Sequence, residues 1–356
     1  MNPFMYFRKN TGKTAIIVLI LVLSVFCLSF ISTLVDSVYA TAREAVVDPL
    51  SRFTVIIENG KHDDDSIPLT DNPYLDKLMD VTVSDVSIKT VFGTTSSYII
   101  CSDNADTIAD AAKRSGIDID VSLLSADKVI MHEDILKNKG VKVGDKIGDF
   151  EVAGTFSGNM KMTFGMVSSE KYETIRSNAQ MYAAFPKEGQ IGTMNEWFSR
   201  IPEKEWTINS ALSADKKLTE EFSSINLILM IVNILVSICL AMAVAVLVYI
   251  IYSGRYDEFA ILNSLGYSKK RIGSQIFLEI LSLALISWAV GYGLSLCVLL
   301  AADKTIYAGM GQSMSVFDPS GLMYTFIVPV LVILFAVVPA VRKLSATDLI
   351  SIIERR

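Results

Sequence analysis

The chain is poor in the residues that build disulfide-linked domains. It has 356 residues but only four cysteines, and charged residues make up 20% of it. Cys27, Cys239 and Cys297 lie in apolar runs, so Cys101 is alone in the polar part of the chain. No disulfide can form within that polar part, which must therefore be stabilised by its own hydrophobic core.

Motifs of catalysis and cofactor binding are equally scarce. The Gly-Lys-Thr sequence at 12–14 has Phe7 where a P-loop needs its first glycine. The only two histidines, His62 and His132, lack metal-ligand spacing, and the acidic run 63–65 lacks the ligand ladder of a calcium loop. No G-x-S-x-G nucleophile motif occurs. We expect a non-enzymatic chain that binds no cofactor itself and no nucleic acid.

Long uncharged apolar runs are abundant. The chain is 51% hydrophobic with a mean hydropathy of +0.43. A bilayer span needs about 20 apolar residues, and four runs reach that length: Ala15–Val35, Ile225–Tyr252, Ile280–Ala302 and Gly321–Val341. The first run is longer than the apolar region of a signal peptide and no clear cleavage site follows it, so a retained span is favoured over cleavage.

Basic residues in the short segments predict the orientation. Only Lys304 lies in the short loop 303–320, whereas the other short segments hold Arg8, Lys9, Lys13, Arg255, Lys269, Lys270, Arg271, Arg342, Lys343, Arg355 and Arg356. The positive-inside rule then places both termini in the cytoplasm and the large insert 36–221 outside the cell. The insert carries a net charge of −11. We interpret this as a soluble surface, although an acidic domain also attracts cationic peptides.

The insert has the pattern of a mixed α/β domain. Val129–Met131 and Arg52–Glu58 are predicted strands. Glu133–Lys139 and Asn104–Ser115 are predicted helices, and each is followed by a glycine that can end it. The fold class is thus a membrane protein with four transmembrane helices and a mixed α/β extracytoplasmic domain between helices 1 and 2.

These patterns divide the chain into nine consecutive parts. They are a cytoplasmic N-terminal tail (1–14), transmembrane helix 1 and stalk (15–40), the extracytoplasmic domain (41–220), stalk and transmembrane helix 2 (221–252), a cytoplasmic coupling loop (253–275), transmembrane helix 3 (276–302), a short external loop (303–320), transmembrane helix 4 (321–341) and a cytoplasmic tail (342–356).

A charged amphipathic segment lies between the second and third spans. Its apolar residues Phe259, Leu262 and Leu265 share a helical face with Ile261 beside them, and Arg255, Asp257 and Glu258 flank it. Gly266 is suited to end this helix and Ser268 to cap the next one. The apolar face could lie in lipid headgroups or in a groove of a partner protein. Glu279, at the start of the third span, is expected to pair with Arg271 or Arg342.

Several motifs resemble those of MacB/FtsX-like permeases of ABC transporters. In the insert they are "GVKVGDKI" (140–147) and "FEVAGTF" (150–156), and near the C-terminus "VVPAVRKLSATDLI" (337–350). The coupling loop matches at Glu258, Ala260-Ile261-Leu262, Ser264-Leu265-Gly266, Ser268, Lys270-Arg271-Ile272 and Phe277-Leu278-Glu279. A proline often follows the basic pair in this family, but Ser345-Ala346-Thr347 stands here, so the shape of the terminal helix is open.

The resemblance implies a role in mechanical coupling. It predicts separate ABC ATPase subunits that hold ATP and Mg, a second permease chain, contact with membrane lipids, and an extracytoplasmic protein or peptide as a further partner. It favours docking of an ATPase on Arg255, Glu258, Phe259, Ile261, Leu262, Leu265 and Gly266. Stalk segments are expected at Thr41–Val47 and Asp215–Phe222, with Leu218 and Phe222 on one helical face.

Two other classes of function are weighed against this one. An ion-coupled carrier is disfavoured because no span has an internal charged residue. A receptor or scaffold that displays the exterior domain, for example to activate cell-wall enzymes, stays open as the alternative. The sequence does not distinguish export or extraction of peptides or lipid-linked substrates from such activation.

Overall fold

The structure, a computed structural model, describes residues 11–60, 68–91, 93–312, 314, 316–317 and 319–346. His62, the acidic run 63–65, the first ten residues and the last ten lie outside the described residues. The chain forms two compact units. The helical unit comprises Met1–Val35, Ile225–Ala302 and Ser315–Arg356, and the α/β unit comprises Asp36–Ser224 and Asp303–Met314.

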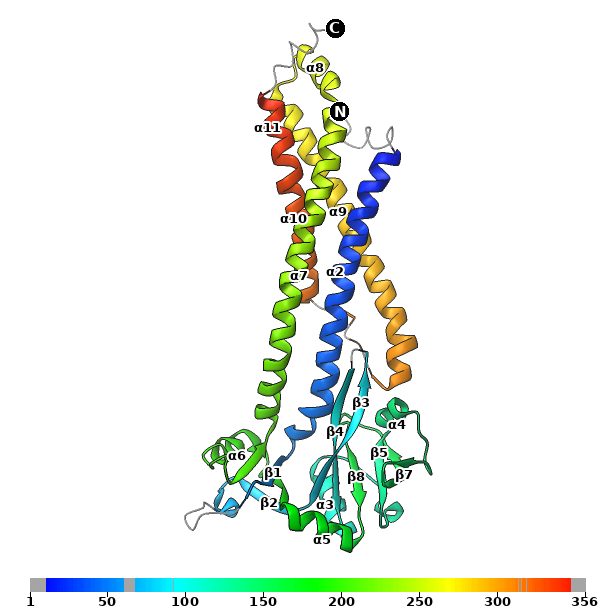
Figure 1. The fold of residues 1–356 in the computed structure, drawn as a ribbon, viewed down its shortest axis with the longest axis vertical. Coiled ribbons are helices and arrows are strands. Elements are labelled where there is room, and N and C mark those ends of the chain that lie inside the picture. The colour runs from blue at the N-terminus through cyan, green and yellow to red at the C-terminus, as the bar shows by residue number, and fades with distance from the viewer. Residues whose placement is uncertain are drawn as a thin grey trace. The chain divides into compact units, whose positions relative to one another are not determined.

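Two very long helices each contribute residues to both units. Helix α2 (Thr11–Val46) has 36 residues and α7 (Ala211–Ser253) has 43. At about 1.5 Å per residue, both are much longer than the roughly 30 Å of a hydrocarbon core. The excess lies in α2 from Asp36 onward and in α7 before Ile225, which are the parts that belong to the α/β unit. Each helix is drawn without a break in Figure 1.

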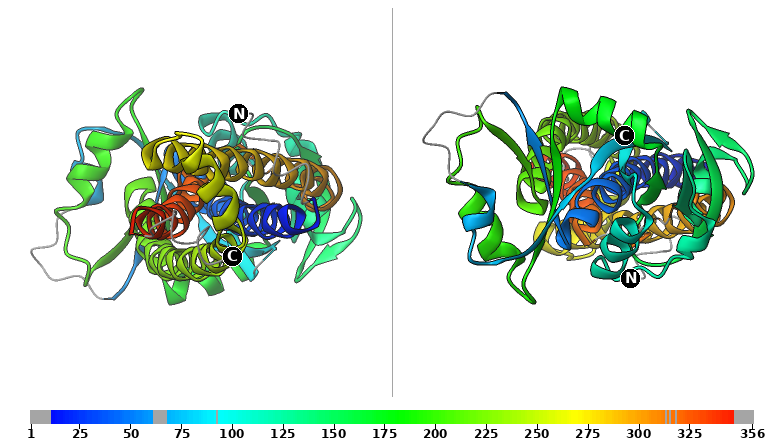
Figure 2. Two further views of the ribbon diagram at one scale, coloured as in Figure 1. Left: turned by 90° about the horizontal axis from the view of Figure 1, so that it is seen from above. Right: turned by 90° about the horizontal axis from the view of Figure 1, so that it is seen from below.

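The remaining helices complete the helical unit. They are α8 (Tyr256–Ser264), α9 (Lys269–Ala302), α10 (Pro319–Val332), the π-helical turn η6 (Ile333–Val337) and α11 (Val338–Ala346). Viewed end-on, the long helices form a bundle with α8 across one end (Figure 2). Pro329, which has no backbone N–H, lies inside α10, and η6 follows it.

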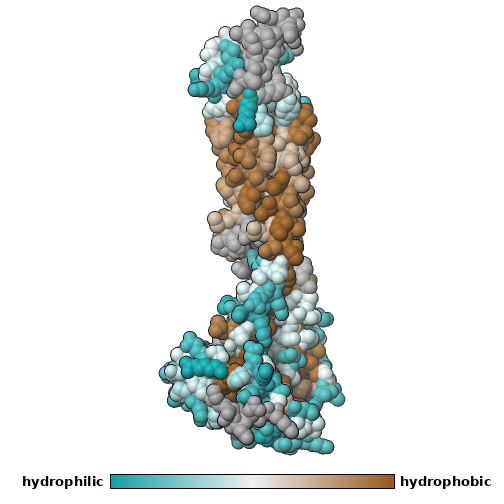
Figure 3. All heavy atoms as spheres, turned by 60° about the vertical axis from the view of Figure 1, so that its left-hand side comes forward, coloured by the Kyte–Doolittle hydropathy of each residue, from teal (hydrophilic) through white to brown (hydrophobic). Residues whose placement is uncertain are grey.

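The chain is a multi-pass membrane protein. Four helical stretches of the described residues are long and apolar enough to cross a bilayer: Thr11–Val46, Ala211–Ser253, Lys269–Met310 and Thr325–Arg342. Apolar residues gather along these helices on the face shown in Figure 3, whereas hydrophilic residues predominate on the α/β unit. This confirms the four predicted spans.

One glycine allows two spans to approach closely. A Cβ atom at Gly291 of α9 would lie 2.6 Å from the carbonyl oxygen of Val22 in α2, so no other residue fits without a backbone shift. Ser287 and Ser295, one turn to either side of it, are fully buried. Small residues at such spacing are typical of helix–helix contacts inside membranes.

The larger sheet of the α/β unit has six strands in the order β3-β4-β8-β5-β7-β6. Their bounds are β3 (Thr82–Thr90), β4 (Gly93–Ser102), β5 (Lys128–His132), β6 (Lys146–Ile147), β7 (Phe150–Phe156) and β8 (Thr163–Met166). The β4–β8 and β5–β7 pairs are parallel and the others antiparallel. Helices α3 (Ala105–Arg114), α4 (Glu133–Lys139) and α5 (Ser169–Asn178) accompany this sheet.

The smaller sheet is fully antiparallel, in the order β10-β1-β9-β2. Its strands are β1 (Thr54–Glu58), β2 (Leu75–Asp80), β9 (Met181–Pro186) and β10 (Trp206–Asn209), and α6 (Ile191–Phe198) packs against it. Leu50, Phe53 and Val55, which follow α2, are fully buried. The chain that leaves the first span therefore enters the core directly.

Local signals in the insert are confirmed. Helix α4 has the predicted bounds, and Gly140 ends it in the left-handed conformation with φ 68°. The side chain of Asn104 caps α3 by accepting a hydrogen bond from the N–H of Asp106. The turn at Gly148 joins β6 to β7, and Gly148 has φ 58°. These elements form where the sequence offers a cap, a stop and a glycine with positive φ.

Candidate functional site: the α7–α8–α9 turn and the stalk

The α7–α9 connection is a short helix between two sharp turns. Arg255 directly precedes α8, and the acidic Asp257 and Glu258 lie in its first turn, where the helix dipole favours them. Gly266 follows α8 with φ 91°, which confirms its role as the stop. The hydroxyl of Ser268 accepts a hydrogen bond from the N–H of Arg271 at 3.3 Å, which confirms it as the cap of α9.

A buried ion pair joins this turn to α9. Nη1 of Arg255 lies 2.9 Å from Oε2 of Glu279, which is only 1% exposed. The Tyr252 hydroxyl donates to the same carboxylate oxygen at 2.7 Å, and the Gln275 amide donates to the other oxygen at 3.2 Å. Glu279 thereby receives three donors from two helices and the turn between α7 and α8. A carboxylate is stable in a buried position only when its oxygens have hydrogen-bond and ion-pair partners of this kind.

The guanidinium of Arg255 is held from several sides. It lies over the rings of Tyr252 and Phe259, at 5.2 Å and 5.0 Å from their centroids, and its Nε donates to Glu258 at 3.2 Å. Burial opposes the positive charge, but the charge of Glu279 and the hydrogen bonds to Glu279 and Glu258 together outweigh it, so the pKa of Arg255 lies above its usual value. The geometry fixes the start of α8 against the ends of α7 and α9.

This network corrects the expected pairing of Glu279 with Arg271 or Arg342. Arg271 instead lies over the ring of Tyr267, 5.1 Å from its centroid. Arg255 is better placed because the reversal of the chain after α7 carries it back onto α9. Tyr252 and Gln275 were not identified from the sequence. Gln275 precedes Glu279 by one helical turn, a spacing that indicates a contact, but Tyr252 offers no such signal.

The apolar face of α8 is partly buried against its own bundle and partly exposed. Phe259 is 3% exposed and packs in the core of the helical unit, with Leu262 partly buried beside it. Ile261 and Leu265 are 55% and 70% exposed. The surface that α8 offers to another protein is therefore narrower than the sequence indicated, because Phe259 and Leu262 attach the helix to its own bundle.

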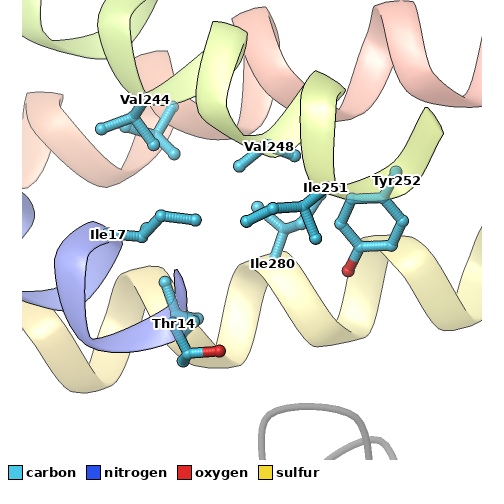
Figure 4. A pocket seen from close by; sticks show the side chains of 9 residues that line it. Thr14, Ile17, Val244, Val248, Ile251, Tyr252 and Ile280 are labelled. Carbon is cyan, nitrogen blue, oxygen red and sulfur yellow. The ribbon is translucent and has the colours of Figure 1, made fainter. Parts of the chain in front are cut away.

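A small apolar cavity lies next to the network. It has a volume of about 20 Å³, room for a single water molecule, and its wall is almost entirely hydrocarbon. Side chains from α2, α7, α9 and α10 surround it (Figure 4), and its lining is Thr14, Ile17, Val244, Val248, Ile251, Tyr252, Ile280, Leu283 and Val332. Its size and lining leave no room for a transport substrate.

The stalk is a pair of helix ends in the α/β unit. Tyr39 of α2 packs edge-on against Phe222 of α7, with ring centroids 5.2 Å apart, and Arg43 pairs with Asp215 at 3.2 Å. Leu218 is buried in the core of the unit together with Ala42 of α2. The exposed ion pair contributes little to stability, so apolar packing holds the two helices together.

Metal-ligating side chains do not cluster in the part of the chain that the structure describes. Within the ranges that the structure describes, no group of three or more His, Cys, Asp or Glu side chains could hold a metal ion. His132 instead caps α4, accepting from the N–H of Asp134 and contacting the carbonyl oxygen of Gly158 at 2.9 Å. Its role in the described structure is to hold the start of α4.

Comparison with known families decides the class of the helical unit. Residues 228–349, which include α8 and its ion network, match the family described as FtsX-like permease C-terminal. The chain carries an FtsX-like permease domain. This part of the chain thus resembles permeases of the ABC-transporter type, and the resemblance of the coupling loop to this group is confirmed. FtsX-like permeases are generally non-catalytic transport components that work with ABC ATPases.

Other comparisons add little to the FtsX-like match. No curated protein matches the chain significantly. Among solved structures, the periplasmic region of MacB from Actinobacillus actinomycetemcomitans is similar with a TM-score of 0.22 and 13% identity. That similarity covers 46% of this chain and 92% of the other. It is too weak to support an inference about this permease.

Proposed function

We propose that this FtsX-like permease transmits ATP-driven motion from a cytoplasmic ATPase to its α/β unit outside the cell. The observation that carries the proposal is the clamped helix α8. A buried ion network fixes its first turn to α7 and α9, while Ile261 and Leu265 stay exposed. A force applied to α8 by a partner would pass into two membrane spans rather than be lost in a mobile loop.

The proposal includes the partners and the path of the motion. ATP and Mg are bound by separate ATPase subunits, and a second permease chain, identical or related, completes the membrane part. Helices α2 and α7 continue from the spans into the stalk without interruption, which supports them as the elements that carry the motion outward. The output is export, extraction or resistance involving peptides or lipid-linked substrates.

Leu265→Asp is expected to remove the ATPase without harming the permease. Leu265 is largely exposed, so the change costs little folding stability. In an interface it would place an unpaired charge against apolar surface, with an expected loss of about 2 kcal/mol or more, roughly 30-fold in affinity. Co-purification of the cognate ATPase measures the effect, and Leu265→Met is the matched control. Wild-type retention by Leu265→Asp would contradict docking through α8.

The orientation is tested by cysteine labelling on intact cells. Cys27, Cys239 and Cys297 are replaced, whereas Cys101 can stay because burial raises the pKa of its thiol to about 12 and leaves it unreactive. An impermeant maleimide is expected to label Ser157→Cys in the α/β unit and to leave Ser264→Cys, at the end of α8, unlabelled until the cells are permeabilised. Both serines are exposed. The reverse pattern would overturn the proposed orientation.

A further inference from the structure

The first part of the connection between α9 and α10, residues 303–312, belongs to the α/β unit. It begins with the π-helical turn η4 (Asp303–Tyr307), which continues α9 directly, and the 3-10 turn η5 (Ala308–Met310). Tyr307 and Gln312 are almost fully buried. This segment is part of the predicted short external loop 303–320, and η5 packs against α4. We call residues 303–312 the clasp.

Asn138 of α4 binds the clasp to the end of β3. Its Oδ1 accepts from the N–H of Lys89 at 2.7 Å, and its Nδ2 donates to the carbonyl of Lys89 at 2.9 Å and to that of Met310 at 3.0 Å. The side-chain amide of Gln312 donates to the same Lys89 carbonyl. Asn138 is itself buried. A buried amide that makes three hydrogen bonds is costly to release, because each lost partner leaves a desolvated polar group.

Gly311 makes the closest contact of the clasp. Its φ is +62°, and a Cβ atom there would collide with the carbonyl oxygen of Asp134 and lie 2.7 Å from its Cα. The collision is with helix backbone, which cannot move aside as a side chain can. Gly309, two residues earlier, has open space at its Cβ position and no positive φ. The two glycines therefore form a matched pair for substitution.

Lys161 connects the clasp to the stalk. Its Nζ lies 2.8 Å from the carboxylate of Glu44 in α2, 3.2 Å from the carbonyl of Gly311 and 3.7 Å from the carboxylate of Asp134. The side chain is only 15% exposed, so these interactions are less screened than those on an open surface. One ammonium group thus joins the last turns of α2, the clasp and the start of α4.

We propose that the clasp is a third mechanical attachment of the α/β unit, through which α9 moves together with that unit, in addition to the two stalk helices. The inference rests on the proposed function. Asn138, Gly311 and Lys161 are its positioning residues. Because α9 continues into η4 without a gap, an axial shift of α9 is transmitted to α4 as long as the clasp is seated.

The seating of the clasp is tested by amide hydrogen exchange of the full-length permease in lipid nanodiscs. Gly311→Ala is expected to raise exchange about tenfold in residues 303–312 and in α4, since local opening governs protection there. Gly309→Ala is expected to leave both segments at wild-type rates. Asn138→Ala serves as the second variant if Gly311→Ala does not fold. Unchanged exchange in both clasp variants would overturn the proposal.

The coupling itself is tested with the cognate ATPase bound and trapped with ATP and vanadate. In the wild type, trapping is expected to change the amide hydrogen exchange of α4. In Gly311→Ala, the change in α4 should be less than about half as large, while the exchange of the stalk helices still changes as in the wild type. If the wild type shows no change anywhere in the α/β unit, the proposed function fails. If the wild type responds and Gly311→Ala responds equally, the clasp proposal alone is overturned.

Discussion

Replacing Glu279 with alanine is expected to detach α8 from the bundle and to remove ATPase binding with it. Arg255 would lose its buried carboxylate partner and keep the exposed Glu258; breaking a buried ion pair typically costs about 3–5 kcal/mol. The Tyr252 hydroxyl would lose its acceptor as well. At about 1.4 kcal/mol per tenfold, the population of the docked state of α8 falls roughly a hundredfold to several thousandfold. A lowered unfolding midpoint in detergent and loss of co-purified ATPase measure this.

The matched control replaces both members of the pair. Arg255→Met combined with Glu279→Leu removes the charge and leaves apolar side chains at both positions, a change that is often neutral for buried ion pairs. The double variant is expected to regain most of the unfolding midpoint that Glu279→Ala loses. If Glu279→Ala matched the wild type in stability and in ATPase binding, the network would not be what holds α8.

A glycine pair in the exposed face of the stalk is expected to uncouple ATP hydrolysis from output. Lys217 and Glu221 of α7 are both exposed, and replacing both with glycine weakens the helix by roughly 1–2 kcal/mol. Binding of the ATPase and hydrolysis should continue, because α8 is untouched. Export or resistance should collapse, because a flexible helix cannot carry force. The ratio of output to ATP hydrolysed measures the effect.

Alanine at the same two positions is the control, since it removes the same side chains but keeps helix propensity. From the sequence, Leu218 and Thr219 would also be candidates for the glycine pair, but Leu218 is buried in the core of the α/β unit. Glycine at Leu218 would leave a cavity and lower the folding stability by about 2–5 kcal/mol. A loss of output could then come from unfolding rather than from uncoupling. Full output from the exposed glycine pair would show that force does not pass through this stalk.

The sequence was sufficient for features that depend on local chemistry. The four spans follow from uncharged runs, and α4 follows from its acidic first turn, its basic last turn and Gly140. The stop at Gly266 and the cap at Ser268 are likewise set by nearby residues. Each of these depends on residues within a few positions of one another, which is why pattern alone predicts them.

The sequence alone could not predict features that depend on residues far apart in the chain. Arg255 and Glu279 are 24 positions apart and meet only because α8 reverses the chain, so the sequence suggested Arg271 or Arg342 as the partner of this carboxylate instead. Asn138 contacts Met310 across 172 positions, and no local signal marks either residue. The burial of Phe259 against its own bundle also follows from packing, because an amphipathic face does not reveal what covers it.

The distance between α8 and the stalk, measured with and without nucleotide, tests the central claim most directly. Spin labels at Ser264→Cys and Lys217→Cys, both at exposed positions, are introduced into permease diluted with unlabelled chains and assembled with its ATPase in nanodiscs. Trapping with ATP and vanadate is expected to shift the distance distribution, and the ATPase mixed with Leu265→Asp permease should produce no shift. Identical distributions in a complex that hydrolyses ATP would contradict transmission through this permease.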